Sequence, residues 1–428
     1  MEQRVAACPR LEGQVVPPGD KSISHRAAIL NSIASGQARV DNVSPGADCL
    51  STMGCLRGLG VEIAIEGNGV SICGRGRGGI VEPQDVLDAG NSATTMRLLA
   101  GLLAAQPFFS VITGDHSLRS RPMGRLIQPL RQMGAELRGR GGDSLAPLAI
   151  KGGTLKGIAY HPPVASAQLK SAVLIAALFA EGVTVVEEPA PSRDHTERML
   201  EAMGAHIRRD GARIELQPGA ALSPLDCRVP GDISAAAFWL VAAAIHPDAV
   251  VTVSNVGVNP SRTGILDVLR DMGARIQVTN ERTEGNEPVA DITARSSELV
   301  ATSLGESTIP RIIDEVPIIA LAASFARGTT TIRDAAELRV KESDRIATTA
   351  KELARLGAHI EELPDGMAVH GGRRLTGVVC ESHGDHRLAM MLGIAALVAD
   401  GETVIADAGA AAVSYPGFWR DLGLLCRT

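Results

Sequence analysis

Basic side chains stand where the sequence predicts that helices begin. In the stretch "PPGDKSISHRAAIL", Lys21, Ser22 and Arg26 stand where a predicted helix begins. A helix N-terminus carries partial positive charge, so cations there are unfavourable unless an anion offsets them. Arg97 in "GNSATTMR" and Arg387 in "DHR" repeat the arrangement. Free backbone N–H groups and guanidinium groups both favour phosphate and carboxylate, so we predict a site for small polyanions.

Further polar residues lie at predicted helix starts or in the loops that precede helices. They are Asn91, Ser92, Thr94, Ser166, Gln168, Lys170, Asp232, Asp385 and His386 at helix starts, and Arg119, Arg121, Arg193, Arg262, Lys341 and Arg345 in loops. Serine and aspartate at a helix start are usually N-caps, an interpretation that fits Ser92 and Asp232 best. We interpret His25 and His386 as packing or supporting residues and do not count them as catalytic.

Two carboxylates, Asp314 in "IDEVP" and Glu342 in "RVKESDR", lie among these cations. A carboxylate in such surroundings either forms structural ion pairs or supplies the acid or base for a reaction of the bound anions. The residues alone leave both interpretations open.

Two glycine-rich stretches are not nucleotide-binding motifs. "GQVVPPGDKS" has the wrong spacing for a phosphate loop, and Pro17 and Pro18 lack the N–H groups that would hold phosphate. "GRGRGG" opens no predicted helix, so it is a tight turn and not a dinucleotide fingerprint.

The chain contains an internal repeat. The segments "LRGLGVEI", "LRQMGAEL", "LEAMGAHI", "LRDMGARI" and "LARLGAHI", with a divergent copy "WRDLGLLC", share a glycine at spacings of 66 to 84 residues. The shared glycines are Gly60, Gly134, Gly204, Gly273, Gly357 and Gly423. Each segment predicts the end of an amphipathic helix, a glycine cap and the start of a strand.

Each repeat also contains an alanine-rich helix that is apolar nearly all round and therefore buried. These helices are predicted at 24–34, 92–105, 166–180, 234–245, 316–326 and 386–399. The fold class is α/β, with two similar domains of three βαβαββ-type repeats around buried parallel helices. "PGD" at 18–20 and again at 230–232 marks the hinges. We therefore place one domain at 20–229 and the other at 1–19 plus 230–428.

Composition narrows the possible functions. The net charge is −6 and aromatic residues make up 2% of the chain, which argues against nucleic-acid binding. No apolar run is long enough to span a bilayer, and "MEQRVAACPR" predicts no signal peptide. Seven scattered cysteines without a C-x-x-C pair predict reduced thiols, a cytoplasmic location and no zinc site.

The motifs together resemble the 5-enolpyruvylshikimate-3-phosphate synthase family along essentially the whole chain. The resemblance rests on "PGDKSISHR", "GNSATTMR", "SRPMGR", "SAQLKSA", "SRDHTE", "IDEVP", "RVKESDR" and "DHR", in this order. It implies the enolpyruvyl transferase fold, whose two domains close over the active site. It also implies transfer of the enolpyruvyl group of phosphoenolpyruvate to the 5-hydroxyl of shikimate 3-phosphate, with release of phosphate and without a metal or organic cofactor. We expect a monomer that binds these small molecules and neither nucleic acid nor membrane.

The resemblance also implies roles for individual residues. Lys21, Asp314 and Glu342 would be catalytic: Asp314 as the base on the 5-hydroxyl, Lys21 and Glu342 as the pair that handles the proton at the methylene carbon. The residues that would bind shikimate 3-phosphate are Lys21, Ser22, Arg26, Ser166, Ala167, Gln168, Arg193, Asp314 and Lys341. Those that would face phosphoenolpyruvate, or the inhibitor glyphosate, are Lys21, Ala93, Arg121, Gln168, Arg345 and Arg387.

The chain departs from many members of this family at three positions. Ala93 replaces a glycine of the "G-N-A-G-T" type motif, and its methyl group predicts exclusion of glyphosate, which is slightly longer than phosphoenolpyruvate. Val413 precedes "SYP" where some members have a lysine, and "SRDHT" offers Arg193 where some have an aromatic residue.

The alternative family with this fold and chemistry is the UDP-N-acetylglucosamine enolpyruvyl transferases. Its members have a catalytic cysteine in the loop before "RP", whereas "GDHSLRSRP" contains none. A repeat scaffold that only binds phosphorylated ligands is disfavoured because acids and bases are paired along the predicted site.

Overall fold

The computed structural model describes residues 1–306 and 308–427, and it divides into two compact units. Unit 1 comprises Met1–Pro18, Pro230–Arg282 and Pro288–Thr428. Unit 2 comprises Gly19–Val229 together with the short segment Thr283–Glu287. The sequence did not predict that residues 283–287, at the tip of a long hairpin, belong with unit 2.

The centre of unit 2 holds three buried helices, α1 (Lys21–Ser32), α3 (Ala93–Ala104) and α7 (Ala167–Ala177). Each begins at a side-chain N-cap: Asp20, Ser92 and Ser166 accept hydrogen bonds from backbone N–H groups of the first turn. These caps satisfy N–H groups that the helix itself cannot pair. Ser92 therefore has the capping role that its sequence position predicts.

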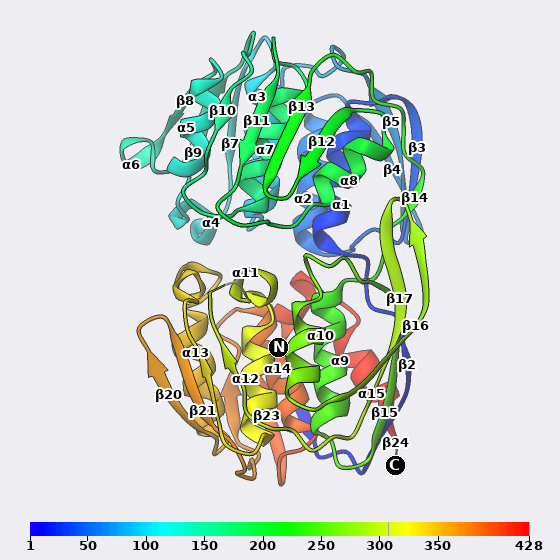
Figure 1. Cartoon of the computed structure of the whole chain (residues 1–428), viewed down its shortest axis with the longest axis vertical. Helices are drawn as coiled ribbons and strands as arrows, with labels where there is room; N and C mark the ends of the chain where they lie inside the picture. Colours follow the sequence, from blue (N-terminus) through cyan, green and yellow to red (C-terminus); the bar gives the residue numbers. More distant parts are fainter. Residues whose placement is uncertain (307, 428) are drawn as a thin grey trace. The chain divides into compact units, whose positions relative to one another are not determined.

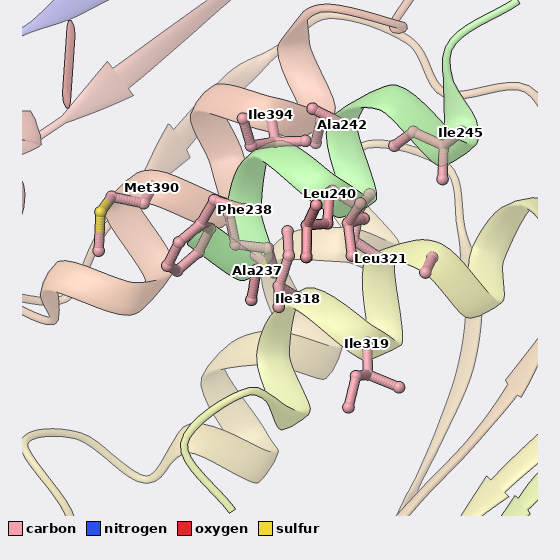
Figure 2. Close-up of a cluster of buried hydrophobic side chains, with 14 of the residues drawn as sticks. Ala237, Phe238, Leu240, Ala242, Ile245, Ile318, Ile319, Leu321, Met390 and Ile394 are labelled. Carbon is pink, nitrogen blue, oxygen red and sulfur yellow. The ribbon is translucent and has the colours of Figure 1, made fainter. Parts of the chain in front are cut away.

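Unit 1 has the corresponding buried helices α9 (Ile233–Ile245), α12 (Val316–Phe325) and α14 (His386–Ala396), which lie side by side (Figure 1). Figure 2 shows Phe238 and Leu240 of α9, Ile318 and Leu321 of α12, and Ile394 of α14 in one hydrophobic cluster. Small alanines let the three helices approach closely, and burial of their larger neighbours supplies most of the stabilisation. All six buried helices predicted from the repeat are present.

Five surface helices end at the repeated glycine. They are α2 (Ala47–Gly58), α5 (Gly124–Gln132), α8 (His195–Ala202), α10 (Gly264–Asp271) and α13 (Arg345–Arg355). The glycines that follow them, Gly60, Gly134, Gly204, Gly273 and Gly357, all have positive φ. The prediction of a sixth glycine cap is wrong: Gly423 lies inside α15 (Phe418–Leu425). The last turn of α15 continues because Leu422 and Leu425 are both buried in the core of unit 1.

Unit 2 contains three sheets of one design, with strand orders β14–β3–β5–β4, β6–β7–β9–β8 and β10–β11–β13–β12 among the described residues. In each, the first pair is parallel and the remaining pairs are antiparallel. The strands are β3 (Ser35–Asp41), β4 (Glu62–Glu66), β5 (Gly69–Arg75), β6 (Leu87–Asp88), β7 (Phe109–Thr113), β8 (Glu136–Gly139), β9 (Leu145–Lys151), β10 (Ala159–Tyr160), β11 (Thr184–Glu187), β12 (His206–Asp210), β13 (Arg213–Gln217) and β14 (Cys227–Arg228).

Unit 1 has a sheet of the same design, β18–β19–β21–β20, together with β16–β17–β15–β2–β24 and β1–β23–β22. The N-terminal strand β2, drawn in blue, runs parallel to β15 (Figure 1). The strands are β1 (Gln3–Ala6), β2 (Arg10–Val15), β15 (Ala249–Gly257), β16 (Arg275–Glu284), β17 (Glu287–Arg295), β18 (Ser303–Leu304), β19 (Thr329–Ile332), β20 (His359–Leu363), β21 (Gly366–His370), β22 (Val379–Glu381), β23 (Glu402–Ala406) and β24 (Cys426–Arg427).

Short helical turns complete the two units. They are α4 (His116–Ser120), α6 (Arg140–Asp143), α11 (Ile309–Ile312), η1 (Ala336–Val340) and η2 (Ala408–Val413). The seven cysteines are free thiols, as the sequence predicts. Within the described ranges, no helix has the length and apolar character needed to cross a membrane.

Candidate active site

The N-terminal turns of the buried helices in unit 2 carry the first part of the predicted site. Lys21, the first residue of α1, forms an ion pair with Asp48 of α2, with 3.0 Å between Nζ and Oδ2. The Lys21 side chain remains 22% exposed, so solvent or a ligand can still reach it. The cation at the helix start is thus partly offset by a carboxylate, and it is placed where an added anion would find both a charge and helix N–H groups.

The first turns of α3 and α7 are joined through Gln168. Its amide nitrogen donates to Thr94 Oγ1 at 2.9 Å, and Arg97 donates to its amide oxygen at 2.5 Å. Arg121, which follows α4, donates to Asn91 Oδ1 at 2.8 Å. The acceptors Asn91 and Thr94 lie close in sequence to Ala93, the first residue of α3, which is 9% exposed.

Arg26 is buried and holds three helices of unit 2 together. Its guanidinium group donates to Thr196 Oγ1 of α8 and to Ser171 Oγ of α7, each at 2.7 Å, and to the Ser22 carbonyl at 2.9 Å. Burial lowers the pKa of Arg26 to about 10, so it stays charged at neutral pH. Its predicted contact with a ligand stays a prediction, while its structural contacts are direct.

Lys170 belongs to a buried ion cluster. Its ammonium group lies 2.8 Å from Glu188 and 2.8 Å from Glu197, and its side chain is 2% exposed. Although burial alone would lower it, these two carboxylates hold the pKa of Lys170 above its ordinary value. Glu188 also accepts from the backbone N–H of Ser166, so the cluster positions the start of α7. Lys170 is therefore structural.

Unit 1 carries the second part of the predicted site, and its centre is the buried Arg345 at the start of α13. The guanidinium group lies 2.6 Å from Glu342, 2.8 Å from Asp385 and 3.6 Å from Asp314. Burial opposes the charge, but the three carboxylates hold the pKa of Arg345 above its ordinary value. One fixed cation thus places the two candidate acid/base residues, Asp314 and Glu342, whose side chains stay about one-fifth exposed.

Arg387 connects the starts of α14 and α12. It lies 3.9 Å from Asp314 and 3.9 Å from Glu315, and Glu315 accepts a hydrogen bond from Ser234 at the start of α9. The N-terminal turns of α9, α12 and α14 therefore meet, as the sequence predicts for parallel buried helices. Lys341 pairs with Glu337 at 2.8 Å.

Asp232, Arg262 and His25 have structural partners. Asp232 caps α9, and Arg262 lies 3.1 Å from it, which fits the capping interpretation. Burial lowers the pKa of His25 to about 3, so the ring is neutral, and its Nδ1 lies 2.6 Å from Thr52 Oγ1. These contacts agree with leaving His25 out of the catalytic set.

Sequence reasoning missed two partners of the site residues. Asp48 and Glu188 pair with Lys21 and Lys170, and neither lies in a predicted motif, whereas Glu315, which pairs with Arg387, lies within "IDEVP". Asp48 could have been noticed as an acidic residue in the first turn of a surface helix, where the helix dipole favours it. Glu188 follows a strand and carries no such signal.

The predicted site residues thus form two sets, each within one unit. Unit 2 places Lys21, Ser22, Arg26, Ala93, Arg121, Ser166, Ala167, Gln168 and Arg193 at or near the starts of its helices, and unit 1 places Asp314, Lys341, Glu342, Arg345 and Arg387 likewise. The first set offers cations and N–H donors that suit phosphate and carboxylate. The second offers partly exposed carboxylates in fixed positions, which can act as an acid or base toward a bound anion.

Comparison with known proteins identifies the family. A profile of EPSP synthase (3-phosphoshikimate 1-carboxyvinyltransferase) matches residues 5–422. The 3-phosphoshikimate 1-carboxyvinyltransferase of Desulforudis audaxviator (strain MP104C) is 55% identical to the chain, and the match covers 99% of this chain and 99% of the relative. The 3-phosphoshikimate 1-carboxyvinyltransferase of Roseiflexus sp. (strain RS-1) is 56% identical, and the match covers 98% of this chain and 97% of the relative. The structure of EPSP synthase from Acinetobacter baumannii superposes with a TM-score of 0.90 at 42% identity, covering 100% of this chain and 99% of that one. The chain therefore belongs to the EPSP synthase family.

Proposed function

We propose that the protein transfers the enolpyruvyl group of phosphoenolpyruvate to the 5-hydroxyl of shikimate 3-phosphate and releases phosphate. Membership of the EPSP synthase family carries this proposal. The geometry supports it because both substrates are polyanions, and the helix starts of both units carry cations and N–H donors. The product is a precursor of chorismate, so the reaction belongs to aromatic amino acid biosynthesis.

We assign the two substrates to overlapping sets of residues. Shikimate 3-phosphate is bound by Lys21, Ser22, Arg26, Ser166, Ala167, Gln168, Arg193, Asp314 and Lys341. Phosphoenolpyruvate is bound by Lys21, Ala93, Arg121, Gln168, Arg345 and Arg387. The support is positional: Arg121 and Gln168 are already oriented by Asn91 and Thr94, so little side-chain freedom is lost on binding.

Three residues carry the proton transfers in this proposal. Asp314 takes the proton from the 5-hydroxyl while the hydroxyl oxygen attacks C2 of phosphoenolpyruvate. The Lys21–Glu342 pair delivers a proton to the methylene carbon. The resulting tetrahedral intermediate loses phosphate, and one methyl proton leaves to restore the double bond. Arg345 supports both carboxylates because its guanidinium group lies beside Asp314 and Glu342. The cations offset the charge that develops on the departing phosphate.

We further propose that the enzyme tolerates glyphosate. Ala93 is the first residue of α3, in a turn whose free N–H groups suit an anion, and its methyl group occupies space that a glycine would leave open. A ligand slightly longer than phosphoenolpyruvate meets that methyl group, whereas phosphoenolpyruvate does not.

The protein works, in this proposal, as a cytosolic monomer on small molecules, without nucleic acid or membrane. The net charge of −6 and the scarcity of aromatic side chains favour small-molecule substrates over nucleic acid. Seven free thiols suit a reducing compartment.

Acceptor choice tests the proposed function. Purified protein is incubated with phosphoenolpyruvate and either shikimate 3-phosphate or UDP-N-acetylglucosamine. The molecular mass of the acceptor is then measured by mass spectrometry. We expect one enolpyruvyl group on shikimate 3-phosphate and no change in the nucleotide sugar. Modification of the nucleotide sugar, or of neither acceptor, would overturn the proposal.

A further inference from the structure

Two histidines and a glutamate meet on the hairpin formed by β20 and β21. His359 and His370 are direct partners across the antiparallel pair, and their rings stack with centroids 4.3 Å apart. Glu361 lies two residues beyond His359 and therefore on the same face of the strand. β20 is the edge strand of its sheet, and His359 and Glu361 are exposed.

The donor atoms of these side chains lie close together. One ligand atom from each residue falls within 4.8 Å of the other two, and His370 Nε2 is 3.1 Å from Glu361 Oε1. Thr329 of β19 places its hydroxyl 3.0 Å from His370 Nδ1. In the neutral ring with its proton on Nδ1, that N–H donates to Thr329 and leaves the Nε2 lone pair directed at the cluster. Such a second hydrogen bond is what fixes the tautomer of a histidine that binds metal.

Although the sequence predicts no zinc site, we propose that His359, Glu361 and His370 bind a divalent transition-metal ion of the zinc type, with water as the fourth ligand. Imidazole and carboxylate ligands suit Zn²⁺, and tetrahedral bonds of ~2.0–2.1 Å place ligand atoms about 3.3 Å apart. Small rotations of three surface side chains bring the present arrangement to that spacing. The carboxylate offsets part of the ion's charge.

The internal repeat supplies a comparison within the same molecule. "LGAHIEE" at 356–362 and "MGAHIRR" at 203–209 occupy the same position in two repeats, so His206 begins β12 as His359 begins β20. His206, however, pairs across the strands with Gln217, and Arg208 stands where Glu361 stands in the other copy. The histidine therefore occurs in both of these repeats, whereas the two further ligands are particular to the β20–β21 hairpin.

The bound ion would fasten an edge strand. The ion joins β20 to β21, and the hydrogen bond between Thr329 and His370 joins β21 to β19. The outer edge of β20 has no neighbouring strand among the described residues. Because the ligand set forms only in the folded hairpin, metal binding stabilises the fold, and the gain rises with the logarithm of the ratio of free metal to Kd. This role is separate from the enolpyruvyl transfer proposed above.

Isothermal titration calorimetry of metal-free protein with Zn²⁺ tests the site by measuring its affinity and stoichiometry. All variants carry Cys73→Ser, because the exposed thiol of Cys73 is a competing ligand. We expect one saturable site per chain and a rise in melting temperature with Zn²⁺. His359→Ala and His370→Ala should each lower the affinity at least ~10-fold, and Thr329→Val about 10-fold, because that hydroxyl orients the ring. His206→Ala, the matched change in the other repeat, should leave the affinity unchanged.

Titration with Co²⁺ gives an independent spectroscopic reading. A tetrahedral nitrogen and oxygen site should show visible absorption without the near-ultraviolet band that a thiolate ligand produces. The proposal is overturned if the Cys73→Ser parent shows no saturable site, if His359→Ala and His370→Ala bind as tightly as the parent, or if His206→Ala loses as much affinity as they do. Melting curves without metal confirm that each variant is folded.

Discussion

At the scale of single residues, the two cations that begin α1 have different surroundings. Arg26 is buried and donates to α7 and α8, whereas Lys21 is partly exposed beside Asp48. A change at Arg26 therefore removes contacts that hold three helices together, and its effect on activity cannot be separated from its effect on folding. Lys21 is the better probe of chemistry because its side chain is partly exposed at the predicted site.

The methyl group of Ala93 tests the glyphosate proposal. Ala93→Gly should make the enzyme more sensitive to glyphosate by about 10-fold or more, since relief of an overpacked contact of this kind is worth ~1–3 kcal/mol. The measurement is the inhibition constant of glyphosate against phosphoenolpyruvate. Ala47→Gly, at the first position of α2 and exposed, is the matched control and should have no effect. Equal sensitivity of Ala93→Gly and the parent would contradict the proposal.

His25 predicts a pH dependence of stability. Burial lowers its pKa to about 3, whereas the ring titrates near ~6.5 in the unfolded chain. Below about pH 6.5 the His25 ring of the unfolded chain binds a proton that the folded protein does not bind. The contribution of His25 to the free energy of unfolding is therefore complete above that pH and is lost as the pH falls toward 3. Between pH 8 and pH 5, the free energy of unfolding falls by about 2 kcal/mol from this cause.

His25→Gln removes the titrating group and should flatten the dependence. Urea unfolding gives the free energy of unfolding of each protein at pH 8 and at pH 5. The decrease between these two pH values should be smaller in the variant than in the parent, by about 2 kcal/mol. The comparison concerns the change with pH, so a constant cost of the substitution does not affect it. Parallel pH profiles for the two proteins would rule out a buried neutral His25.

At the scale of elements, the repeated glycine serves two purposes in the fold. Gly204 follows α8 with φ +88°, a left-handed conformation that L side chains rarely adopt, and a methyl group there would meet open space. Gly423 lies inside α15, and a methyl group there would also meet nothing within 4 Å. The two positions therefore differ in backbone conformation and not in crowding.

Alanine at these two glycines should have opposite effects. Gly204→Ala should lower the free energy of unfolding by about 1 kcal/mol, because alanine is strained at positive φ. Gly423→Ala should raise it by about 0.5–1 kcal/mol, because alanine favours a helix interior. Urea unfolding of the two variants measures both. A loss of stability at Gly423 would show that the glycine is needed there.

At the scale of the whole molecule, repetition made much of the fold predictable. Six buried alanine-rich helices follow from their apolar composition, and five glycine caps follow from the shared motif. The placement of cations at the helix starts was also predictable, because residue types and helix-start signals are both read from short stretches of sequence. These features are local in sequence, so short stretches contain the information.

Features that depend on contacts between residues distant in the sequence were not predictable. Asp48 lies 27 residues from Lys21, and residues 283–287 join unit 2 at the tip of a hairpin that begins in unit 1. His359 and His370 meet only because the β20–β21 register sets them opposite each other. A shift of one residue in that register would place them on opposite faces.

The central claim is that residues of both units serve one enolpyruvyl transfer. The most direct measurement is the rate of phosphate release from phosphoenolpyruvate. It compares the parent with two site variants, Lys21→Met in unit 2 and Asp314→Asn in unit 1. Lys156→Met, at an exposed position, is the control. The parent and control should release phosphate only when shikimate 3-phosphate is also present, and each site variant should be slower by a factor on the order of 10² or more. Phosphate release without shikimate 3-phosphate, or a rate equal to the parent's in either site variant, would contradict the account.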